Sequence, residues 1–86
     1  MMHAYVLTET RTGAAPEVCQ LVAEIPGVTS TEIVVGPFDV IAAVEAEDGE
    51  ELERVILHRI RAVEGVIRTL TCRRTLAGIP AGAGIL

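Results

Sequence analysis

The fold is decided by residues 29–46, which read TSTEIVVGPFDVIAAVEA. The first part of this stretch, Thr29–Val35, is rich in β-branched residues, and Val40–Ala46 alternates, so each part is predicted to form a strand. The residues between them, Gly36–Asp39, make a connection short enough for an antiparallel hairpin. We therefore expect the second and third strands of the chain here.

A strand and a helix precede this hairpin. His3–Thr8 combines Tyr, Val, Leu and Thr without a helical period, which favours a strand. From Ala14 the apolar residues recur at helical spacing until Pro26-Gly27 ends the helix. The predicted buried stripe of this helix consists of Val18, Leu21, Val22 and Ile25.

A helix and a strand also follow the hairpin. Asp48 stands three residues before Glu51, a variant of the capping box that predicts the start of a helix. Gly65 ends this helix, and Val66–Thr75 alternates as a fourth strand does. The predicted buried stripe of the helix consists of Leu52, Val55, Ile56, Ile60 and Val63.

The order of these elements predicts an α+β fold. Strand, helix and strand occur twice, which is the ferredoxin-like βαββαβ arrangement: a four-stranded antiparallel sheet with both helices on one face and the first and third strands at its centre. In the third strand Val40, Ala42 and Val44 point one way, while Ile41 and Ala43 point the other. Because both faces of this central strand are apolar, we expect a second sheet to cover the open face in a dimeric α/β sandwich or barrel.

The composition limits the classes of function. The chain has 86 residues, enough for one domain, and residues 77–86 read as a C-terminal tail rich in Gly and Ala. Half of the residues are hydrophobic, so we expect apolar area to be buried between the subunits of a homo-oligomer. The net charge of −5 repels phosphate groups, which argues against direct binding of nucleic acid.

Several further classes of site and location are also unexpected. Charged residues interrupt every apolar run before it reaches a membrane-spanning length, so no membrane association is predicted. No signal peptide begins at Met1, and Cys19 and Cys72 do not suggest a disulfide framework, which together place the protein in the cytoplasm. His3 and His58 lack partners at ligand spacing, and no phosphate-binding loop occurs, so neither a metal nor a cofactor is predicted.

The hairpin turn and the last strand offer candidate binding residues. Gly36 can bring the backbone close to a ligand and adopt angles closed to other residues, Phe38 provides an apolar wall, and Asp39 provides a charge. Thr69 and Thr71 carry hydroxyls that can bind a carboxylate. Ordinary turn chemistry and the preference of threonine for strands also account for all of these residues.

Taken together, the elements and the turn resemble the effector domain of Lrp/AsnC-type regulators, the RAM domain, over Ala4–Arg74. The resemblance implies a stand-alone domain of this type over residues 1–76, which dimerises by facing its sheet toward that of a second copy. It also implies assembly into a ring of four dimers that binds a small effector, commonly an amino acid, between dimers. The segments that carry the resemblance are Ile25-Pro26-Gly27-Val28, Gly36-Pro37-Phe38-Asp39, Gly65-Val66 and Arg68-Thr69-Leu70-Thr71.

The resemblance also implies a set of ligand-binding residues, carried over by position. Gly36 and Asp39 match the family's Gly-Xaa-Tyr-Asp turn, in which Phe38 replaces the tyrosine and Pro37 stands where many relatives are acidic. A zwitterionic ligand needs an anion for its ammonium group and donors for its carboxylate, which Asp39 and the threonines can supply. The implied ligand-binding residues are Gly36, Pro37, Phe38, Asp39, Thr69 and Thr71.

Three hypotheses for the function follow. Full-length regulators of this family carry a helix-turn-helix domain, which this chain is expected to lack. The leading hypothesis is therefore a non-enzymatic module that senses an amino acid and assembles, and that modulates transcription alone or together with full-length Lrp/AsnC regulators. The alternative is a small dimeric α/β-barrel enzyme of the cofactor-free monooxygenase or isomerase type, with His3 and Tyr5 as proton-transfer groups. The third hypothesis is a purely structural oligomer.

Overall fold

The computed structural model describes residues 1–75. The predicted boundary at residue 76 and the tail at 77–86 lie outside the described residues. None of the helices in residues 1–75 is both long and apolar enough to cross a membrane. The elements in chain order are β1 (Met2–Thr10), α1 (Ala15–Ala23), β2 (Val28–Ile33), β3 (Val40–Ala46), α2 (Gly49–Glu51), a π-helical segment η1 (Leu52–Leu57), α3 (His58–Arg61) and β4 (Val66–Arg74).

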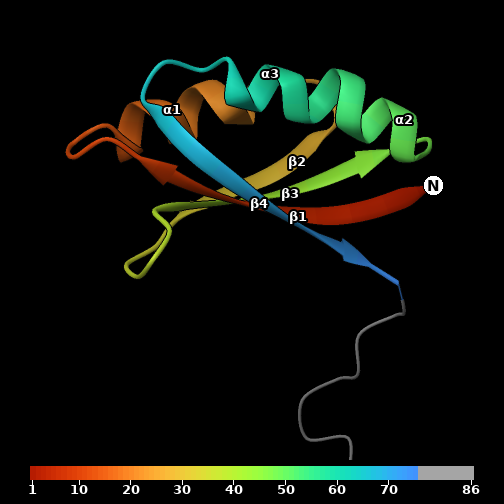
Figure 1. The fold of residues 1–86 in the computed structure, drawn as a ribbon, viewed down its shortest axis with the longest axis horizontal. Helices are drawn as coiled ribbons and strands as arrows, with labels where there is room; N and C mark the ends of the chain where they lie inside the picture. Colours follow the sequence, from red (N-terminus) through yellow and green to blue (C-terminus); the bar gives the residue numbers. More distant parts are fainter. Residues whose placement is uncertain (76–86) are drawn as a thin grey trace, which may run out of the picture.

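The strands form one antiparallel sheet in the order β2-β3-β1-β4. Figure 1 shows the helices on one side of this sheet, and no other element of residues 1–75 covers the opposite side. Because β1 and β3 occupy the centre, the predicted ferredoxin-like α+β fold is confirmed. In the register, Thr8 of β1 lies directly opposite Val40 of β3 and Thr69 of β4, and residues that lie opposite each other share one face of the sheet.

The hydrophobic core lies between the sheet and the helices. Val6 of β1 and Ala42 of β3 point toward the helices and are fully buried, as are Val18 and Val22 of the predicted stripe on α1. Burial of an aliphatic side chain of this size stabilises the fold by about 1.5–3 kcal/mol. The buried hydrophobic residues are Ala4, Val6, Val18, Val22, Val40, Ala42, Val44, Ala46, Leu52, Ile56, Leu57 and Ile60.

The second helix begins with the predicted cap and then departs from regular α-helical geometry. Asp48 Oδ1 accepts a hydrogen bond from the backbone N–H of Glu51 at 2.9 Å, and Glu51 Oε1 accepts one from the backbone N–H of Glu47 at 3.0 Å. A π-helical turn such as η1 contains more residues than an α-helical one, which rotates its side chains away from the predicted stripe. Leu57 is therefore buried, whereas Val55, which was predicted to be buried, is 42% exposed.

Both helices are followed by a glycine in the left-handed region. Gly27 has a φ of 99° and Gly65 a φ of 100°, which side chains other than glycine rarely adopt. A Cβ added to Gly27 would lie 2.6 Å from Ile56 Cδ1 and 3.1 Å from the carbonyl oxygen of Glu45. Both glycines lie in the turns that follow the helices, but α1 already ends at Ala23 and α3 at Arg61, earlier than predicted, so Ile25 and Val63 of the predicted stripes lie beyond the helices. At residue 27 the packing adds a second requirement for glycine.

Some boundaries differ from the predicted ones. β1 continues past Thr8 to Thr10, because the hairpin supplies a side-chain partner for the strand end. β2 ends at Ile33, since the chain turns into a loop in which Val35 is fully exposed. Leu21 of the predicted stripe on α1 lies toward the outer side of the helix and is 40% exposed.

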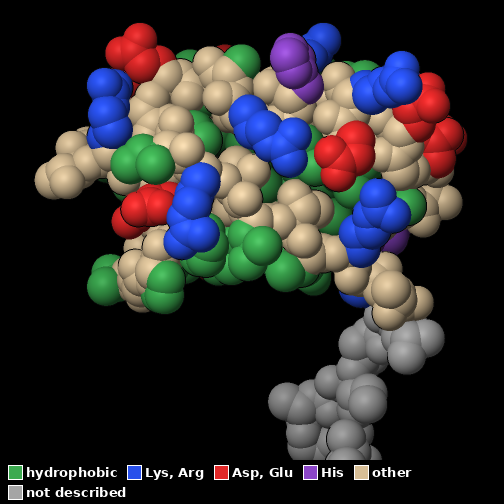
Figure 2. Space-filling view, in the orientation of Figure 1, with side chains coloured by type: hydrophobic (Ala, Val, Ile, Leu, Met, Phe, Trp, Pro, Cys, Tyr) green, Lys and Arg blue, Asp and Glu red, His purple; other side chains and the backbone are tan. Residues whose placement is uncertain are grey.

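The uncovered side of the sheet is apolar along its middle. We call this surface the open face and define it by Tyr5, Leu7, Ile41 and Leu70. Leu7 lies directly opposite Ile41 on one side and Leu70 on the other, so the side chains are neighbours on one face. Figure 2 shows hydrophobic side chains gathered on the side of the molecule away from the helices. Tyr5 is 44% and Leu70 50% exposed, so a single chain leaves much of this apolar area in water.

Candidate functional site

The predicted turn forms the loop between β2 and β3, residues 34–39. The backbone N–H of Val34 donates to the carbonyl oxygen of Asp39 at 2.9 Å and closes the loop. Figure 1 shows this loop projecting on the side away from the helices. A Cβ added to Gly36 meets no atom within 4 Å, and its φ lies outside the left-handed region, contrary to the expected special backbone angle. Nothing within residues 1–75 therefore requires glycine at residue 36.

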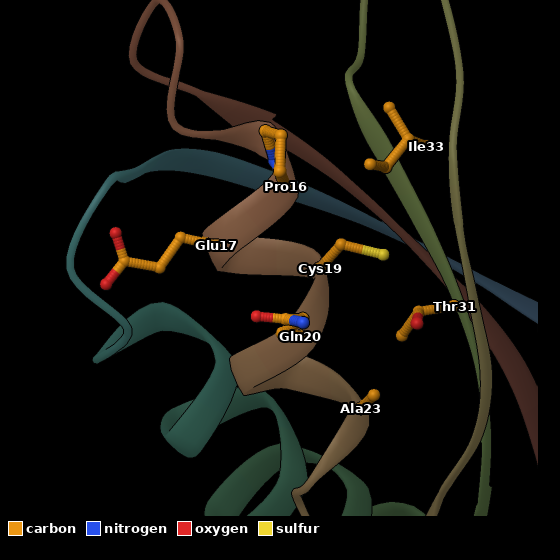
Figure 3. Close-up of a pocket in the computed structure, with 7 residues that line it drawn as sticks. All are labelled: Pro16, Glu17, Cys19, Gln20, Ala23, Thr31 and Ile33. Atoms are coloured by element: carbon orange, nitrogen blue, oxygen red, sulfur yellow. The ribbon is translucent and has the colours of Figure 1, made fainter.

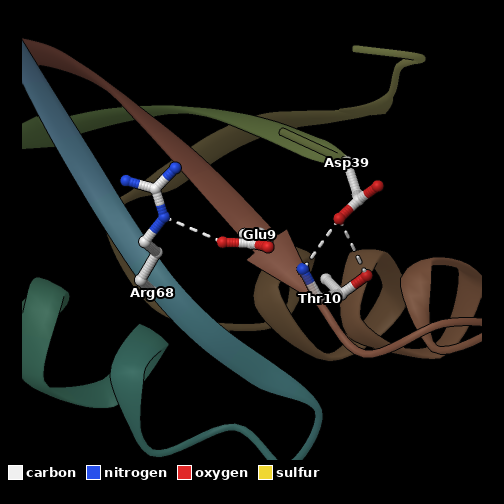
Figure 4. A network of polar contacts seen from close by, with 4 residues as sticks. All are labelled: Glu9, Thr10, Asp39 and Arg68. Atoms are coloured by element: carbon white, nitrogen blue, oxygen red, sulfur yellow. Dashed lines mark hydrogen bonds and ion pairs between the residues drawn. The ribbon is translucent and has the colours of Figure 1, made fainter. Parts of the chain in front are cut away.

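Asp39 is bonded to the end of β1. Its backbone N–H donates to the carbonyl oxygen of Thr8 at 2.9 Å. Its Oδ2 accepts hydrogen bonds from the backbone N–H of Thr10 at 2.8 Å and from the hydroxyl of Thr10 at 3.3 Å (Figure 4). The Asp39 side chain thus takes the place of a main-chain acceptor beyond the last pair of the β1–β3 ladder. Without it, the buried N–H of Thr10 would be unpaired. Asp39 holds the loop against β1.

Arg68 lies at the same end of the sheet. Its Nε donates to Glu9 Oε1 at 2.8 Å, and the two residues lie directly opposite each other on β4 and β1. The guanidinium carbon of Arg68 is 4.9 Å from the centre of the Phe38 ring, which is a cation–π contact. Figure 4 shows Arg68 pointing away from the helices, with Glu9 between it and Asp39. We call Glu9, Phe38, Asp39 and Arg68 the hairpin cluster.

The structure does not bring Thr69 and Thr71 to the hairpin cluster within one chain. Thr69 lies opposite Thr8, which is fully buried beneath the helices. Thr71 lies opposite Val6, which is also fully buried. The Nε of Arg61 on α3 donates to Thr69 Oγ1 at 3.3 Å. Both threonines thus belong to the helix side of the edge strand β4, and their role in ligand binding stays a prediction.

The candidate site residues predicted from the sequence do not include Glu9 or Arg68. The one usable signal is strand alternation, since Arg68 shares a face with Leu70 and Glu9 shares one with Leu7. Their contact joins residues 59 positions apart in the chain. Such a pair depends on the register of β1 against β4, which no local pattern specifies.

The proton-transfer groups of the enzyme hypothesis lie toward the other end of β1. His3 Nδ1 is 3.6 Å from Glu45 Oε2, and these side chains are 36% and 41% exposed. Tyr5 is half-exposed on the open face, opposite Ala43 and Cys72. The contact between His3 and Glu45 is a weak surface interaction, because it is long and both groups are exposed. Within residues 1–75 no three His, Cys, Asp or Glu side chains converge as ligands of a metal ion.

A groove of about 570 Å³ runs between α1 and the edge strand β2 (Figure 3). Cys19 points into the groove from α1, and Thr31 and Ile33 face it from β2. Ile33 is 53% exposed there. The groove opens on the helix side of the sheet, whereas Arg68 and Glu9 lie on the other side, so the groove and the hairpin cluster are separate features.

The comparison with protein families decides where this chain belongs. The family model described as the Lrp/AsnC ligand binding domain matches residues 3–73. The chain belongs to this family. The match extends from β1 to β4 and confirms the resemblance seen in the sequence.

This Lrp/AsnC domain is similar to proteins of several organisms. An uncharacterized HTH-type transcriptional regulator of Pyrococcus furiosus is 36% identical over 55 residues, which are 64% of this chain and 37% of the regulator's length. A homocitrate synthase of Sulfurisphaera tokodaii is 47% identical over 47 residues, which are 55% of this chain and 10% of that enzyme. A Thermus thermophilus protein with a crystal structure is 35% identical in sequence, and its structure matches this one with a TM-score of 0.84 over 93% of this chain and 100% of that chain.

Proposed function

We propose that this chain is a non-enzymatic regulatory module that binds a small effector, an amino acid, and assembles with copies of itself. Members of the Lrp/AsnC regulatory family bind small-molecule effectors and oligomerise. The observation that carries the proposal is the half-exposed apolar surface of the open face in a chain that belongs to this family. Transcriptional regulation is the proposed context, since the Pyrococcus furiosus relative is named as an HTH-type regulator.

The open face supports association through the sheet. On the helix side, the alternate residues Val6 and Ala42 are fully buried, whereas Tyr5 and Leu70 on the open face are half-exposed. Two open faces packed against each other would remove these side chains from water at about 25 cal/mol per Å² of apolar area. The proposed dimer is therefore a sandwich of two sheets, and four such dimers form a ring.

The proposed effector binds between dimers at the loop 34–39. The space around Gly36 leaves the backbone of this loop accessible to another molecule, and Val35 beside it is fully exposed. Asp39 is half-buried, and of its two carboxylate oxygens only Oδ2 accepts hydrogen bonds within residues 1–75. The proposed contacts, supplied by neighbouring subunits, are Gly36, Pro37, Phe38, Asp39, Thr69 and Thr71.

Nothing in the site or the comparisons favours catalysis. His3 and Tyr5 are surface groups of the sheet, and their carboxylate neighbour Glu45 is only weakly engaged. The likeness to a homocitrate synthase covers 10% of that enzyme, which is too small a part to transfer its reaction to this chain. The proposed partners are further copies of the chain and full-length regulators of the same family, in the cytoplasm.

Titration of the assembled protein with each standard amino acid tests the proposal. Light scattering first establishes the oligomeric state, and isothermal titration calorimetry then measures binding. Saturable binding of at least one amino acid at micromolar to millimolar concentration is expected, together with a mass above that of one chain. A single chain in solution at micromolar concentration would refute the assembly, and an oligomer that binds no amino acid would refute the sensing role.

A further inference from the structure

We propose that Arg68 binds the carboxylate of the ligand, with Glu9 and Phe38 holding its guanidinium group in place. This role of Arg68 rests on the ligand-binding function proposed above and extends the site across β1 to the edge strand β4. Arg68 lies at the end of the sheet from which the loop 34–39 projects, in contact with Phe38 of that loop. The charge and geometry of the hairpin cluster support the assignment.

Two contacts orient the guanidinium group of Arg68 but leave its terminal nitrogens without a partner in residues 1–75. Its Nε donates to Glu9 Oε1 at 2.8 Å, and its central carbon lies over the Phe38 ring. Hydrogen bonds and ion pairs within residues 1–75 do not use Nη1 or Nη2 of Arg68. The side chain shares the face of Leu70 but lies two residues closer to the loop end of β4, and it is 61% exposed in a single chain. Two terminal nitrogens in a fixed fork match the two oxygens of a carboxylate. Because two contacts already restrict the side chain, less rotamer entropy is lost when a carboxylate binds.

The neighbouring carboxylates indicate the chemical class of the ligand. Glu9 uses Oε1 for Arg68, and Asp39 uses Oδ2 for Thr10, so within the described residues Glu9 Oε2 and Asp39 Oδ1 have no hydrogen-bond donor. Figure 4 shows Arg68, Glu9 and Asp39 following one another across β1. A cationic group followed by two anionic ones complements a molecule that carries a carboxylate and an ammonium group. Phe38 offers an apolar contact beside them.

Arg68 suits the carboxylate better than its neighbour Thr69. The two residues are adjacent on β4 and therefore point to opposite faces of the sheet. Thr69 accepts a hydrogen bond from Arg61 on the helix side. A hydrogen bond from an ionised donor is roughly twice as strong as a neutral one, which favours the guanidinium over a hydroxyl.

Two probes test Arg68 in the full 86-residue protein. Isothermal titration uses the amino acid that binds the wild-type protein, and thermal unfolding is followed in sodium acetate against sodium chloride at equal ionic strength. Arg68→Gln is expected to raise the dissociation constant of the amino acid at least about tenfold and to abolish the extra stabilisation by acetate. Arg59→Gln, which removes an exposed arginine of α3 on the helix side, is the matched control and should change neither.

The variant Glu9→Gln tests whether Arg68 binds a carboxylate or only supports the fold. The amide oxygen can still accept the hydrogen bond from Nε, but the charge that offsets Arg68 is lost. Acetate binding should therefore tighten by about threefold or more, whereas a residue that only supported the fold would lose affinity or leave it unchanged.

Each outcome separates Arg68 from the wider function. Amino-acid binding that Arg68→Gln leaves intact overturns the role of Arg68 and preserves the sensing module. If no amino acid binds, the proposed function fails, and the acetate measurement still decides whether Arg68 is a carboxylate site. Loss of the oligomer in Arg68→Gln, without any acetate effect in the wild type, would assign Arg68 to a subunit contact and overturn the proposal.

Discussion

The carboxylate of Asp39 takes the place of a main-chain acceptor for Thr10 at the point where β3 and β1 separate. One oxygen accepts both hydrogen bonds from Thr10, at 2.8 and 3.3 Å. Asp39 therefore supports the fold of the hairpin, whatever it contributes to a ligand. Its structural and binding roles can be separated by substitution, because an amide keeps the acceptor oxygen but not the charge.

Asp39→Ala and Asp39→Asn should differ in stability. Alanine leaves the N–H and hydroxyl of Thr10 without their partner, so the free energy of unfolding should fall by about 1–3 kcal/mol. Asparagine should stay within about 1 kcal/mol of the wild type, while amino-acid affinity falls if the negative charge binds an ammonium group. Urea unfolding at one fixed protein concentration measures stability, and calorimetric titration measures affinity. Equal stabilities for the two variants would contradict the structural role.

Leu70→Glu and Leu21→Glu form a matched pair for the assembly. Both leucines are partly exposed, at 50% and 40%, but Leu70 lies on the open face and Leu21 on α1. A carboxylate placed in a buried sheet-to-sheet interface costs several kcal/mol, so Leu70→Glu should weaken dimer formation by about a hundredfold or more. Leu21→Glu should keep the wild-type mass. Light scattering over a dilution series checks both, and association that survives Leu70→Glu would place the interface elsewhere.

Gly27→Ala should destabilise the protein far more than Gly36→Ala. At residue 27 the left-handed backbone and the close approach of Ile56 act together, and a loss of about 2–4 kcal/mol is expected. At residue 36 a methyl group meets open space, so stability should stay within about 1 kcal/mol. Thermal unfolding measures both changes. If Gly36→Ala instead impairs ligand binding or assembly, a second molecule occupies the space that one chain leaves free.

Thr8→Val should stabilise the protein. The hydroxyl of Thr8 is buried and has no hydrogen-bond partner within residues 1–75, and valine has nearly the same shape. Removing the unsatisfied group should raise the free energy of unfolding by about 1 kcal/mol. Thr10→Val is the control, because the Thr10 hydroxyl donates to Asp39 and its loss should lower stability by about 0.5–1.5 kcal/mol. A destabilised Thr8→Val, measured by urea unfolding, would contradict this prediction.

The elements were predictable where the signal is local. Asp48 and Glu51 form the cap that their spacing predicts. Gly27 and Gly65 have the left-handed backbone expected after a helix, although α1 and α3 end four residues before them. The prediction that Val55 is buried was wrong, because the π-helical segment changes the number of residues per turn and brings Leu57 inward. Regular helical spacing gives no indication of such a segment.

The candidate site was predictable only in part. The loop 34–39 contains the predicted turn at residues 36–39 but starts two residues earlier, and Asp39 accepts hydrogen bonds from Thr10. The grouping of Thr69 and Thr71 with this loop remains a prediction about neighbouring subunits. Arg68 was not among the predicted site residues, because its contacts, Glu9 and Phe38, are remote in sequence.

Residue types and their spacing were sufficient to determine the order of strands and helices, the start of the second helix and the apolar character of both sheet faces. These features follow from backbone preferences and from periodic burial, which act over a few neighbouring residues. Only the tertiary structure decided that Arg68, and not Thr69, stands beside the hairpin. That choice depends on the register between β1 and β4, where a shift of one residue would move every side chain of the strand to the opposite face.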